Sequence, residues 1–250
     1  MRYLTLNTVD GGTLKVAKYI LGSGCFFSLE EEEAFRLIDR FLELGGDTID
    51  VARSYGAERD QISFGLVEAK LRRYIESRNN RDKVKISTKG AFPDLRPDFS
   101  MSRFRLNREA ILGDFYSSYD TLRNGPIDIY MLHRDDTSLP VSNIMDTIHE
   151  IVDSGEVKVI GVSNWSMERI QEANVYARSR GKAELAVSEI MWAYAYTDHQ
   201  RREDYTLSIM NNGKLYKQYE QSNIPIFAFT SQSRGLWSLL TNGKDTWESL

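Results

Sequence analysis

The sequence has a single cysteine, Cys25, which excludes an intrachain disulfide and a metal site built from several cysteines. No apolar run approaches the ~18 residues of a membrane span, and residues 1–6 lack the apolar core of a signal peptide. Five prolines exclude a proline-rich chain. The 32 Lys and Arg against 36 Asp and Glu give a net charge of -4, without the basic face that nucleic-acid binding needs. We therefore expect a soluble, cytoplasmic protein that binds neither membranes nor nucleic acids.

Apolar runs of strand length alternate with helical patterns along the 250 residues. Strands are predicted at 16–21, 48–51, 84–87, 127–132, 157–162, 185–190 and 224–229. Helices are predicted behind Ser28 and at 60–77, 108–122, 142–152, 167–178 and 207–221. This alternation is typical of parallel strands joined by helical crossovers, in an α/β fold. A (β/α) barrel and an open doubly wound sheet both fit, but Gly22 and Gly24 lack the third glycine of a dinucleotide-binding turn, which disfavours the open sheet.

Two local signals concern the N-terminal part. Asp10, Gly11 and Gly12 predict the turn of a hairpin. Ser28 with Glu31 resembles a capping box, which predicts that Ser28 caps the helix that follows.

Polar or functional side chains stand where the predicted strands end. They are Asp50, Tyr55, Lys89, His133, Ser163, Asn164, Glu189 and Phe229. In a barrel of parallel strands, catalytic residues gather at this end. We therefore expect these side chains to lie together.

Four of these residues are suited to one reaction. A nearby ammonium such as that of Lys89 favours the phenolate of Tyr55 and makes this phenol a better proton donor. Asp50 can supply the counter-charge that a buried lysine needs, and His133 can orient a carbonyl oxygen. Such a site protonates a carbonyl oxygen while hydride reaches the carbon, and a nicotinamide cofactor would have to supply the hydride.

Each residue also has a structural interpretation: Asp50 as a helix cap, Tyr55 and Lys89 as surface residues, His133 as a packed histidine. His149 and His199 are interpreted as structural, and Cys25 as a packing residue. A metal site at His133, Asp135 and Asp136 is disfavoured because no second histidine lies nearby in the sequence. A serine nucleophile is disfavoured because residues 161–164, GVSN, lack the second glycine of a nucleophile elbow.

Five segments resemble the aldo/keto reductase family. Residues 46–56 (GDTIDVARSYG) are similar to the segment with its catalytic aspartate and tyrosine, and 86–89 (ISTK) to the strand with its lysine. Residues 128–136 (DIYMLHRDD) resemble the histidine strand, and 155–164 (GEVKVIGVSN) the strand whose Ser-Asn pair holds the nicotinamide carboxamide. Residues 228–231 (AFTS) resemble the segment with the aromatic residue that stacks on nicotinamide.

The resemblance implies a (β/α)8 TIM barrel that uses NADPH to reduce small aldehydes or ketones to alcohols. It implies catalytic roles for Asp50, Tyr55, Lys89 and His133. The implied cofactor-binding residues are Gly22, Ser23, Asp50, Ser163, Asn164, Glu189, Phe229 and Thr230. No metal is implied. Similar barrels also serve as redox-sensing, cofactor-binding regulatory subunits, which is the alternative function.

This chain departs from the family in three places. Glu189 stands where the family usually has a glutamine, and a carboxylate can accept from the carboxamide but cannot donate to it. Phe229 offers a ring without a hydroxyl. The family continues with another strand and helix that close the barrel and carry the basic residues for the 2'-phosphate of NADP, whereas this sequence ends at Leu250. We therefore expect one domain, residues 1–250, that is C-terminally incomplete with about seven strands, and an inactive truncated fragment is a further alternative.

Four aromatic side chains are candidates for the substrate pocket: Phe26, Phe27, Trp165 and Trp192. An aromatic wall would favour an apolar or aromatic carbonyl compound. The alternative for these residues is packing between the barrel and its helices. The sequence does not predict an oligomeric state.

Overall fold

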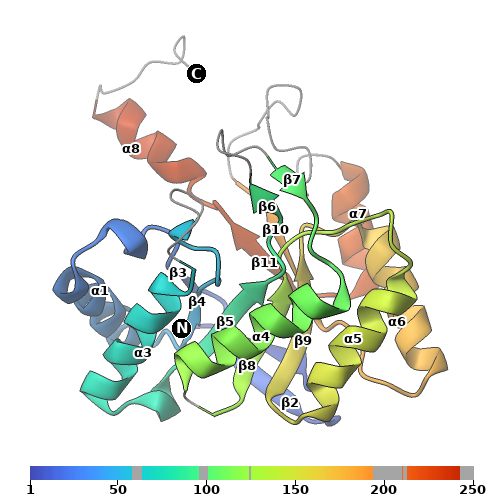
Figure 1. The fold of residues 1–250 in the computed structure, drawn as a ribbon. Coiled ribbons are helices and arrows are strands. Elements are labelled where there is room, and N and C mark those ends of the chain that lie inside the picture. Colours follow the sequence, from blue (N-terminus) through green and yellow to red (C-terminus); the bar gives the residue numbers. More distant parts are fainter. Residues whose placement is uncertain (58–63, 96–100, 124, 194–209, 211–212, 243–250) are drawn as a thin grey trace.

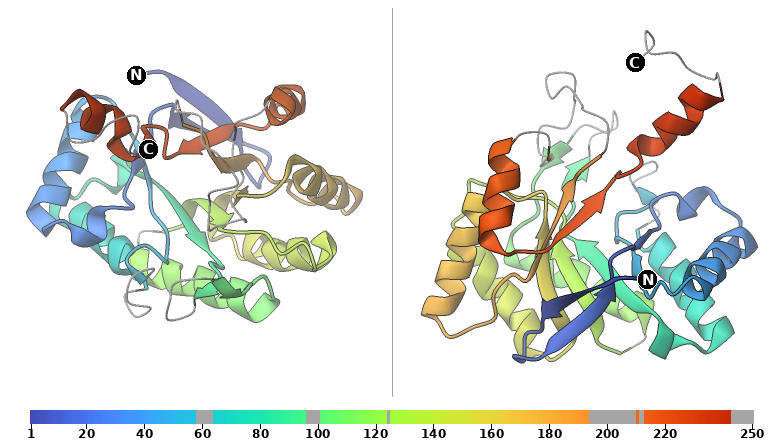
Figure 2. Two further views of the ribbon diagram at one scale, coloured as in Figure 1. Left: turned by 90° about the horizontal axis from the view of Figure 1, so that it is seen from above. Right: turned by 180° about the vertical axis from the view of Figure 1, so that it is seen from behind.

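Seven short strands form one parallel sheet in the computed structural model, which describes residues 1–57, 64–95, 101–123, 125–193, 210 and 213–242. The strands are β3 (Leu21–Gly22), β4 (Thr48–Asp50), β5 (Lys85–Gly90), β8 (Ile127–Leu132), β9 (Val157–Ser163), β10 (Val187–Met191) and β11 (Ile226–Phe229). Their order across the sheet is β11-β10-β9-β8-β5-β4-β3. Figures 1 and 2 show the sheet curving into a nearly closed barrel with helices outside, so the predicted α/β barrel is confirmed.

The strands are apolar because both of their faces are covered. All six residues of β8 are buried. Ile129 and Met131 belong to a core inside the barrel, whereas Tyr130 and Leu132 belong to the core between sheet and helices. This double burial is why the strands appear in the sequence as continuous apolar runs rather than as alternating patterns.

The helices lie on the outside of the sheet, except the last one, which projects beyond the end of the barrel (Figure 1). They are α1 (Glu31–Glu43), α3 (Leu66–Arg78), α4 (Arg108–Leu122), α5 (Val141–Asp153), α6 (Met167–Ser179), α7 (Gly213–Ser222) and α8 (Leu236–Thr241). Ile38, Leu71, Phe115, Ile148 and Ile170 bury the inner faces of α1, α3, α4, α5 and α6 in one outer core. Of the helices that the structure describes, none has the length and apolar character to cross a bilayer.

The predicted N-terminal hairpin is present, and it covers the end of the barrel where the strands begin (Figure 2). It consists of β1 (Tyr3–Asn7) and β2 (Thr13–Ala17), which pair antiparallel. Leu6 and Val16 pack with Val159 and Val187 in the inner core. The end of the barrel where the strands finish is therefore the end that remains for a site.

Two predictions for the N-terminal part are wrong. The strand expected at 16–21 is divided into two. Its first residues belong to β2, which ends at Ala17 and is paired with the hairpin partner, where the Lys18 backbone N–H also donates to the Arg2 carbonyl. The strand of the barrel, β3, begins only at Leu21. The capping box does not form. The α1 cap position is Glu30, and the Ser28 hydroxyl instead donates to the Cys25 carbonyl.

The remaining strands and helices begin and end near their predicted limits, with three differences. The helix predicted at 60–77 begins at Leu66, after Gly65 in a left-handed conformation (φ +76°), and residues 60–63 lie outside the described residues. The helix predicted at 207–221 begins at Gly213, with 207–209, 211 and 212 not described. A hairpin of β6 (Asp94–Leu95) and β7 (Met101–Arg103), and helix α8, were not predicted.

Cys25 is exposed, so its interpretation as a packing residue is wrong. His149 is buried, and its Nε2 lies 2.9 Å from the Ala183 carbonyl oxygen, as expected of a structural histidine. His199 lies outside the described residues.

We predict that Gly161→Ala destabilises the barrel by about 1–3 kcal/mol, the usual cost of overpacking. A Cβ on Gly161 would lie 2.5 Å from Val187 Cγ1 and 2.6 Å from the Val187 carbonyl oxygen, so β9 and β10 would have to separate. The matched control is Gly113→Ala in the middle of α4, where a Cβ meets nothing within 4 Å. This control should raise stability by about 0.5–1 kcal/mol. Urea unfolding of both variants measures the difference, and equal midpoints would contradict the prediction.

Candidate active site

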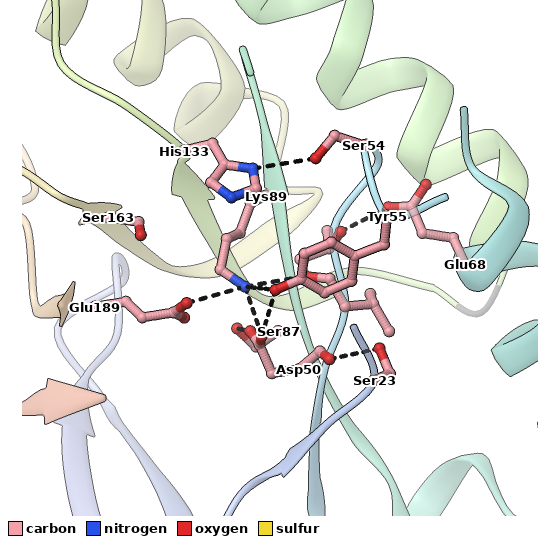
Figure 3. Close-up of polar contacts among 12 residues, drawn as sticks. Ser23, Asp50, Ser54, Tyr55, Glu68, Ser87, Lys89, His133, Ser163 and Glu189 are labelled. Atoms are coloured by element: carbon pink, nitrogen blue, oxygen red, sulfur yellow. Dashed lines mark hydrogen bonds and ion pairs between the residues drawn. The ribbon is translucent and has the colours of Figure 1, made fainter. Parts of the chain in front are cut away.

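Parallel register brings the predicted site residues together at the carboxyl ends of the strands (Figure 3). Asp50 is the last residue of β4 and pairs with Ser87 of β5, whose side chain shares a face with that of Lys89 two residues later. Glu189 of β10 pairs with Ser163, the last residue of β9. Backbone pairing continues just past the strand ends. The His133 backbone N–H, for example, donates to the Gly90 carbonyl.

Lys89 stands at the centre of the site, and its side chain is fully buried. Its Nζ donates to Asp50 Oδ2 at 2.5 Å and to the Tyr55 hydroxyl at 3.2 Å. Glu189 Oε1 lies 3.2 Å from the same nitrogen. Asp50 is held from its other side by the Ser87 hydroxyl, which donates to Oδ1 at 2.9 Å. A single ammonium therefore joins three of the predicted site residues.

Burial and charge oppose each other on Lys89 and Tyr55. Burial acts to lower the pKa of Lys89, but the negative charge of Asp50, with that of Glu189 when Glu189 is ionised, outweighs burial and raises this pKa well above its ordinary value. For Tyr55, burial is the largest effect and raises the pKa, while the charge of Lys89 lowers it in part. The sequence-based expectation that Lys89 lowers the pKa of Tyr55 thus describes one contribution, which burial exceeds. The site holds a neutral phenol beside a charged ammonium.

His133 follows β8 and contacts Ser54 and Phe92. Its Nδ1 lies 3.4 Å from Ser54 Oγ, and its ring packs edge-on against Phe92 with centroids 4.7 Å apart. Burial lowers the pKa of His133 well below its ordinary value, and the charges of Arg134 and Lys89 lower it further. His133 is therefore a neutral imidazole near pH 7, suited to orienting an oxygen rather than carrying a charge.

Side chains with carboxamide-binding chemistry lie on the neighbouring ends of β9 and β10. The Asn164 amide Nδ2 donates to Ser163 Oγ at 2.9 Å, and the Asn164 backbone N–H donates to the Glu189 carbonyl at 2.9 Å. Asn164 has a left-handed backbone (φ +64°), a conformation that asparagine tolerates better than most residues. A hydroxyl, an amide and a carboxyl group together provide the donors and acceptors that a nicotinamide carboxamide requires.

The other predicted cofactor residues flank this group. The Ser23 hydroxyl and backbone N–H both donate to the Asp50 carbonyl, at 2.7 and 3.0 Å, which joins the turn after β3 to β4. Gly22 precedes it and pairs with Asp50. Phe229 is the last residue of β11, and Thr230 follows it with a φ of +54°. Both are half-buried at the edge of the sheet.

Glu189 is buried and contacts Lys89, which its predicted role as a cofactor residue did not indicate. Burial raises the pKa of Glu189 to about 8, and the nearby charge of Asp50 adds to this, while Lys89 acts in the opposite direction. Near pH 7 the group is therefore largely a neutral acid, able to donate as well as accept a hydrogen bond.

The four candidate substrate aromatics differ in their surroundings. Phe26 and Trp165 are buried in the outer core, and Trp165 Nε1 donates to the Arg134 carbonyl at 3.1 Å, which favours packing for these two. Phe27 is half-buried in the short 3-10 helix η1 (Phe26–Ser28). Trp192 follows β10 and is 38% exposed, so its ring is accessible at the end of the barrel that carries the site.

The segment with Phe26 is fixed by a buried lysine. Lys70 of α3 donates from Nζ to the Phe26 carbonyl at 2.7 Å and to the Leu29 carbonyl at 2.5 Å. The Phe26 carbonyl also accepts from the Leu29 backbone N–H, so the ammonium adds a second donor at this turn.

Three residues of the site were not identified from the sequence: Ser54, Ser87 and Phe92. Ser87 had a usable signal, because it lies two residues before Lys89 on the same strand and therefore on the same face. Ser54 and Phe92 contact His133 through loops whose paths have no signal in the local sequence.

The residues of the disfavoured metal site serve other contacts. Arg169 Nε donates to Asp135 Oδ2 at 3.0 Å. Asp136 accepts from the Ser138 hydroxyl at 2.6 Å. Within the described ranges no three His, Cys, Asp or Glu residues are grouped so that they could hold a metal ion.

The model of the aldo/keto reductase family matches residues 18–239, which includes every strand of the barrel and the whole site. The chain belongs to this family. The fold and the five resembling segments agree with this assignment.

Several curated aldo/keto reductases and dehydrogenases are similar to this chain. Norsolorinic acid reductase stcV of Emericella nidulans is 31% identical over 68% of this chain and 43% of the relative. The putative aryl-alcohol dehydrogenase AAD14 of Saccharomyces cerevisiae is 30% identical over 75% of this chain and 51% of the relative. The aryl-alcohol dehydrogenase [NADP(+)] of Phanerodontia chrysosporium is 28% identical over 70% of this chain and 45% of the relative. The chain thus spans about half the length of the curated relatives it matches.

We predict that Lys89→Met destabilises this aldo/keto reductase by about 3–5 kcal/mol at pH 8, because removing one partner of a buried ion pair leaves uncompensated charge. The loss should be smaller at pH 5, because buried carboxyl groups that have lost their cation bind protons more readily at the lower pH. The control is Lys182→Met, which removes an exposed pair with Asp153 (2.7 Å) and should cost at most about 1 kcal/mol. Urea unfolding at both pH values tests this, and a loss independent of pH would contradict it.

Proposed function

We propose that the protein reduces aldehydes or ketones to alcohols with NADPH, and that Tyr55 donates the proton. The observation that carries the proposal is the position of Lys89 Nζ, which lies between the Asp50 carboxylate (2.5 Å) and the Tyr55 hydroxyl (3.2 Å) in a buried site. Buried lysines need a counter-charge, and a phenol beside an ammonium is a proton donor whose anion is stabilised.

The residues present fit a nicotinamide cofactor. Ser163, Asn164 and Glu189 would hold its carboxamide, and Phe229 would stack on its ring, with Gly22, Ser23 and Thr230 lining the adjacent strand ends. When bound, the reduced nicotinamide supplies the hydride. The family assignment supports this choice, and the NADP(+) in the name of the Phanerodontia chrysosporium relative supports the phosphorylated form for this chain.

The chain's own residues control the proton and the position of the carbonyl. Tyr55 keeps its proton near pH 7 because burial raises its pKa, so it is present as a donor. As the proton leaves, negative charge develops on the phenol oxygen, and the ammonium 3.2 Å away stabilises that charge. Asp50 keeps Lys89 charged and oriented, and Ser87 orients Asp50.

His133 has the protonation state needed to orient a substrate oxygen. Its Nδ1 contacts Ser54, so Nε2 is the ring nitrogen left to hydrogen-bond a carbonyl oxygen. A neutral imidazole does this without adding a second positive charge next to Lys89. Asp50, Tyr55, Lys89 and His133 thus have complementary roles at one point of the barrel.

The proposed substrate class is an aromatic or apolar carbonyl compound. Trp192 is exposed beyond β10, where its ring packs edge-on against Tyr216 with centroids 6.0 Å apart. The name aryl-alcohol dehydrogenase, which two of the relatives carry, supports an aromatic substrate. A panel of aromatic and aliphatic aldehydes and ketones tests this class.

We predict that Tyr55→Phe lowers the rate of aldehyde reduction by roughly 10²–10⁴, the usual contribution of a general acid, and leaves the Kd for NADPH within about threefold. The matched control is Tyr116→Phe on α4, whose ring is 41% exposed and outside the site, and it should retain the full rate. Stopped-flow decay of NADPH absorbance gives the rate, and fluorescence titration gives the Kd.

Equal reduction rates for the unaltered protein and Tyr55→Phe would contradict the role of Tyr55. Tight NADPH binding without turnover on any compound of the panel would contradict the enzymatic function. That second result would support the alternative of a cofactor-binding, redox-sensing regulatory subunit.

A further inference from the structure

Lys89 has more acceptors around its ammonium than it has hydrogens to donate. Oxygens of Asp50 (2.5 Å), Tyr55 (3.2 Å), Glu189 (3.2 Å) and Val51 (3.3 Å) lie around Nζ. A lysine ammonium donates three hydrogen bonds. The four acceptors therefore compete for three hydrogen bonds. A change in the charge of one acceptor alters how strongly the ammonium binds the other three.

The site also holds two carboxyl groups for one cation. Asp50, Lys89 and Glu189 are all buried, and an unpaired buried charge is costly. The site is electrically balanced when one carboxyl group is neutral. Asp50 has the shorter contact with Lys89 and a further donor in Ser87, so Asp50 is the better placed of the two carboxyl groups to pair with the ammonium. Glu189 has the longer contact, and it is the group whose proton is retained.

Among the described residues, the charged groups that act on the Glu189 carboxyl group are Asp50 and Lys89. Within the described part of the chain, the only ion pair of Glu189 is with Lys89. On β9 its register partner is Ser163, and on β11 it is Phe227, neither of which is charged. His133, beyond β8, is neutral near pH 7.

The other ionisable side chains on elements next to Glu189 either have a partner of their own or belong to the cluster around Lys89. The hydroxyl of Tyr219 on α7, which packs behind β10, lies 2.7 Å from Ser188 Oγ. Asp50 and Tyr55 reach the cluster from β4 and the loop after it. Burial and the charge of Asp50 raise the pKa of Glu189 against the effect of Lys89, in keeping with this arrangement.

We propose that Glu189 is an ionisable positioning residue that controls how the hydrogen bonds of the Lys89 ammonium are divided among Asp50, Tyr55 and Glu189 itself. As a neutral acid, Glu189 leaves the ammonium to Asp50 and Tyr55. As a carboxylate, it competes with Tyr55 for the ammonium. The proton that Glu189 loses passes to solvent, and no other bond changes.

This role rests on the proposed function, in which Tyr55 donates a proton and becomes more negative in the transition state. A carboxylate 3.2 Å from Lys89 Nζ adds negative charge next to that developing charge and weakens its stabilisation. Reduction should therefore slow as Glu189 ionises. The result is an alkaline limit on the reaction that is set by Glu189 rather than by Tyr55.

The pH profile of kcat/KM, with NADPH and 4-nitrobenzaldehyde as the probe substrate, tests the role. Glutamine in Glu189→Gln is similar in size and cannot ionise. We expect the ratio of kcat/KM between Glu189→Gln and the unaltered protein to rise at least about tenfold from pH 6.5 to pH 9.5. Glu189→Asp keeps an ionisable group and should keep the alkaline decline. Glu43→Gln, at an exposed pair with Arg40 on α1, should reproduce the unaltered profile.

A measurement without turnover separates this inference from the proposed function. In protein with ¹³C-labelled glutamate carboxyl groups, a resonance that titrates well above the ordinary glutamate range should be missing from Glu189→Gln or, if that variant does not fold, from Glu189→Asp. The buried Glu68, whose pKa burial also raises, should keep its own resonance in these variants. If the Glu189 resonance is found but no carbonyl compound is reduced, the proposed function fails and the ionisation of Glu189 stands. If reduction occurs but the profiles of Glu189→Gln and the unaltered protein coincide, or no such resonance exists, the inference is overturned.

Discussion

The buried pair between Lys89 and Asp50 is the interaction on which the site depends. An ammonium inside a barrel is tolerated only next to a carboxylate, and the register of β4 and β5 that pairs Asp50 with Ser87 places this carboxylate beside Lys89. That register also fixes the start of the loop after β4, where the backbone N–H of Arg53 donates to the Lys89 carbonyl. The position of Tyr55 follows from this loop. The ion pair, the register of β4 and β5, and the place of the phenol are thus linked at one point of the barrel.

The barrel was predictable because its strands are buried on both faces and its helices on one. Double burial produces apolar runs such as that of β8, and single burial produces helical periodicity as in α5. The polar residues that interrupt these runs at their ends identified Asp50, Lys89 and His133. These signals are all local in sequence, and for that reason they can be read without a structure.

The capping box failed on a local contact, that of the Ser28 hydroxyl with the Cys25 carbonyl. Other differences arose where the deciding contact is distant in sequence. Whether Ala17 continues into a strand of the barrel depends on pairing between Lys18 and Arg2 across the hairpin. The contact of Glu189 with Lys89 joins β10 to β5, which are not neighbours in the sheet, so the interior of the barrel brings them together. Phe26 is an aromatic residue of the kind that lines substrate pockets. The Lys70 ammonium on α3 binds the Phe26 carbonyl, however, and the ring of Phe26 lies in the core.

The N-terminal hairpin has a consequence for the order of folding. Leu6 and Val16 pack in the inner core with Val187 and Phe227, which lie on β10 and β11, the strands of the sheet most distant from the hairpin in the described sequence. The hairpin can form early from local contacts, yet its apolar face stays uncovered until β10 and β11 are in place. Contacts so distant in sequence slow the folding of a domain. The docking of the hairpin therefore waits for strands that lie far from it in the sequence, and it is this docking that fills one end of the barrel interior.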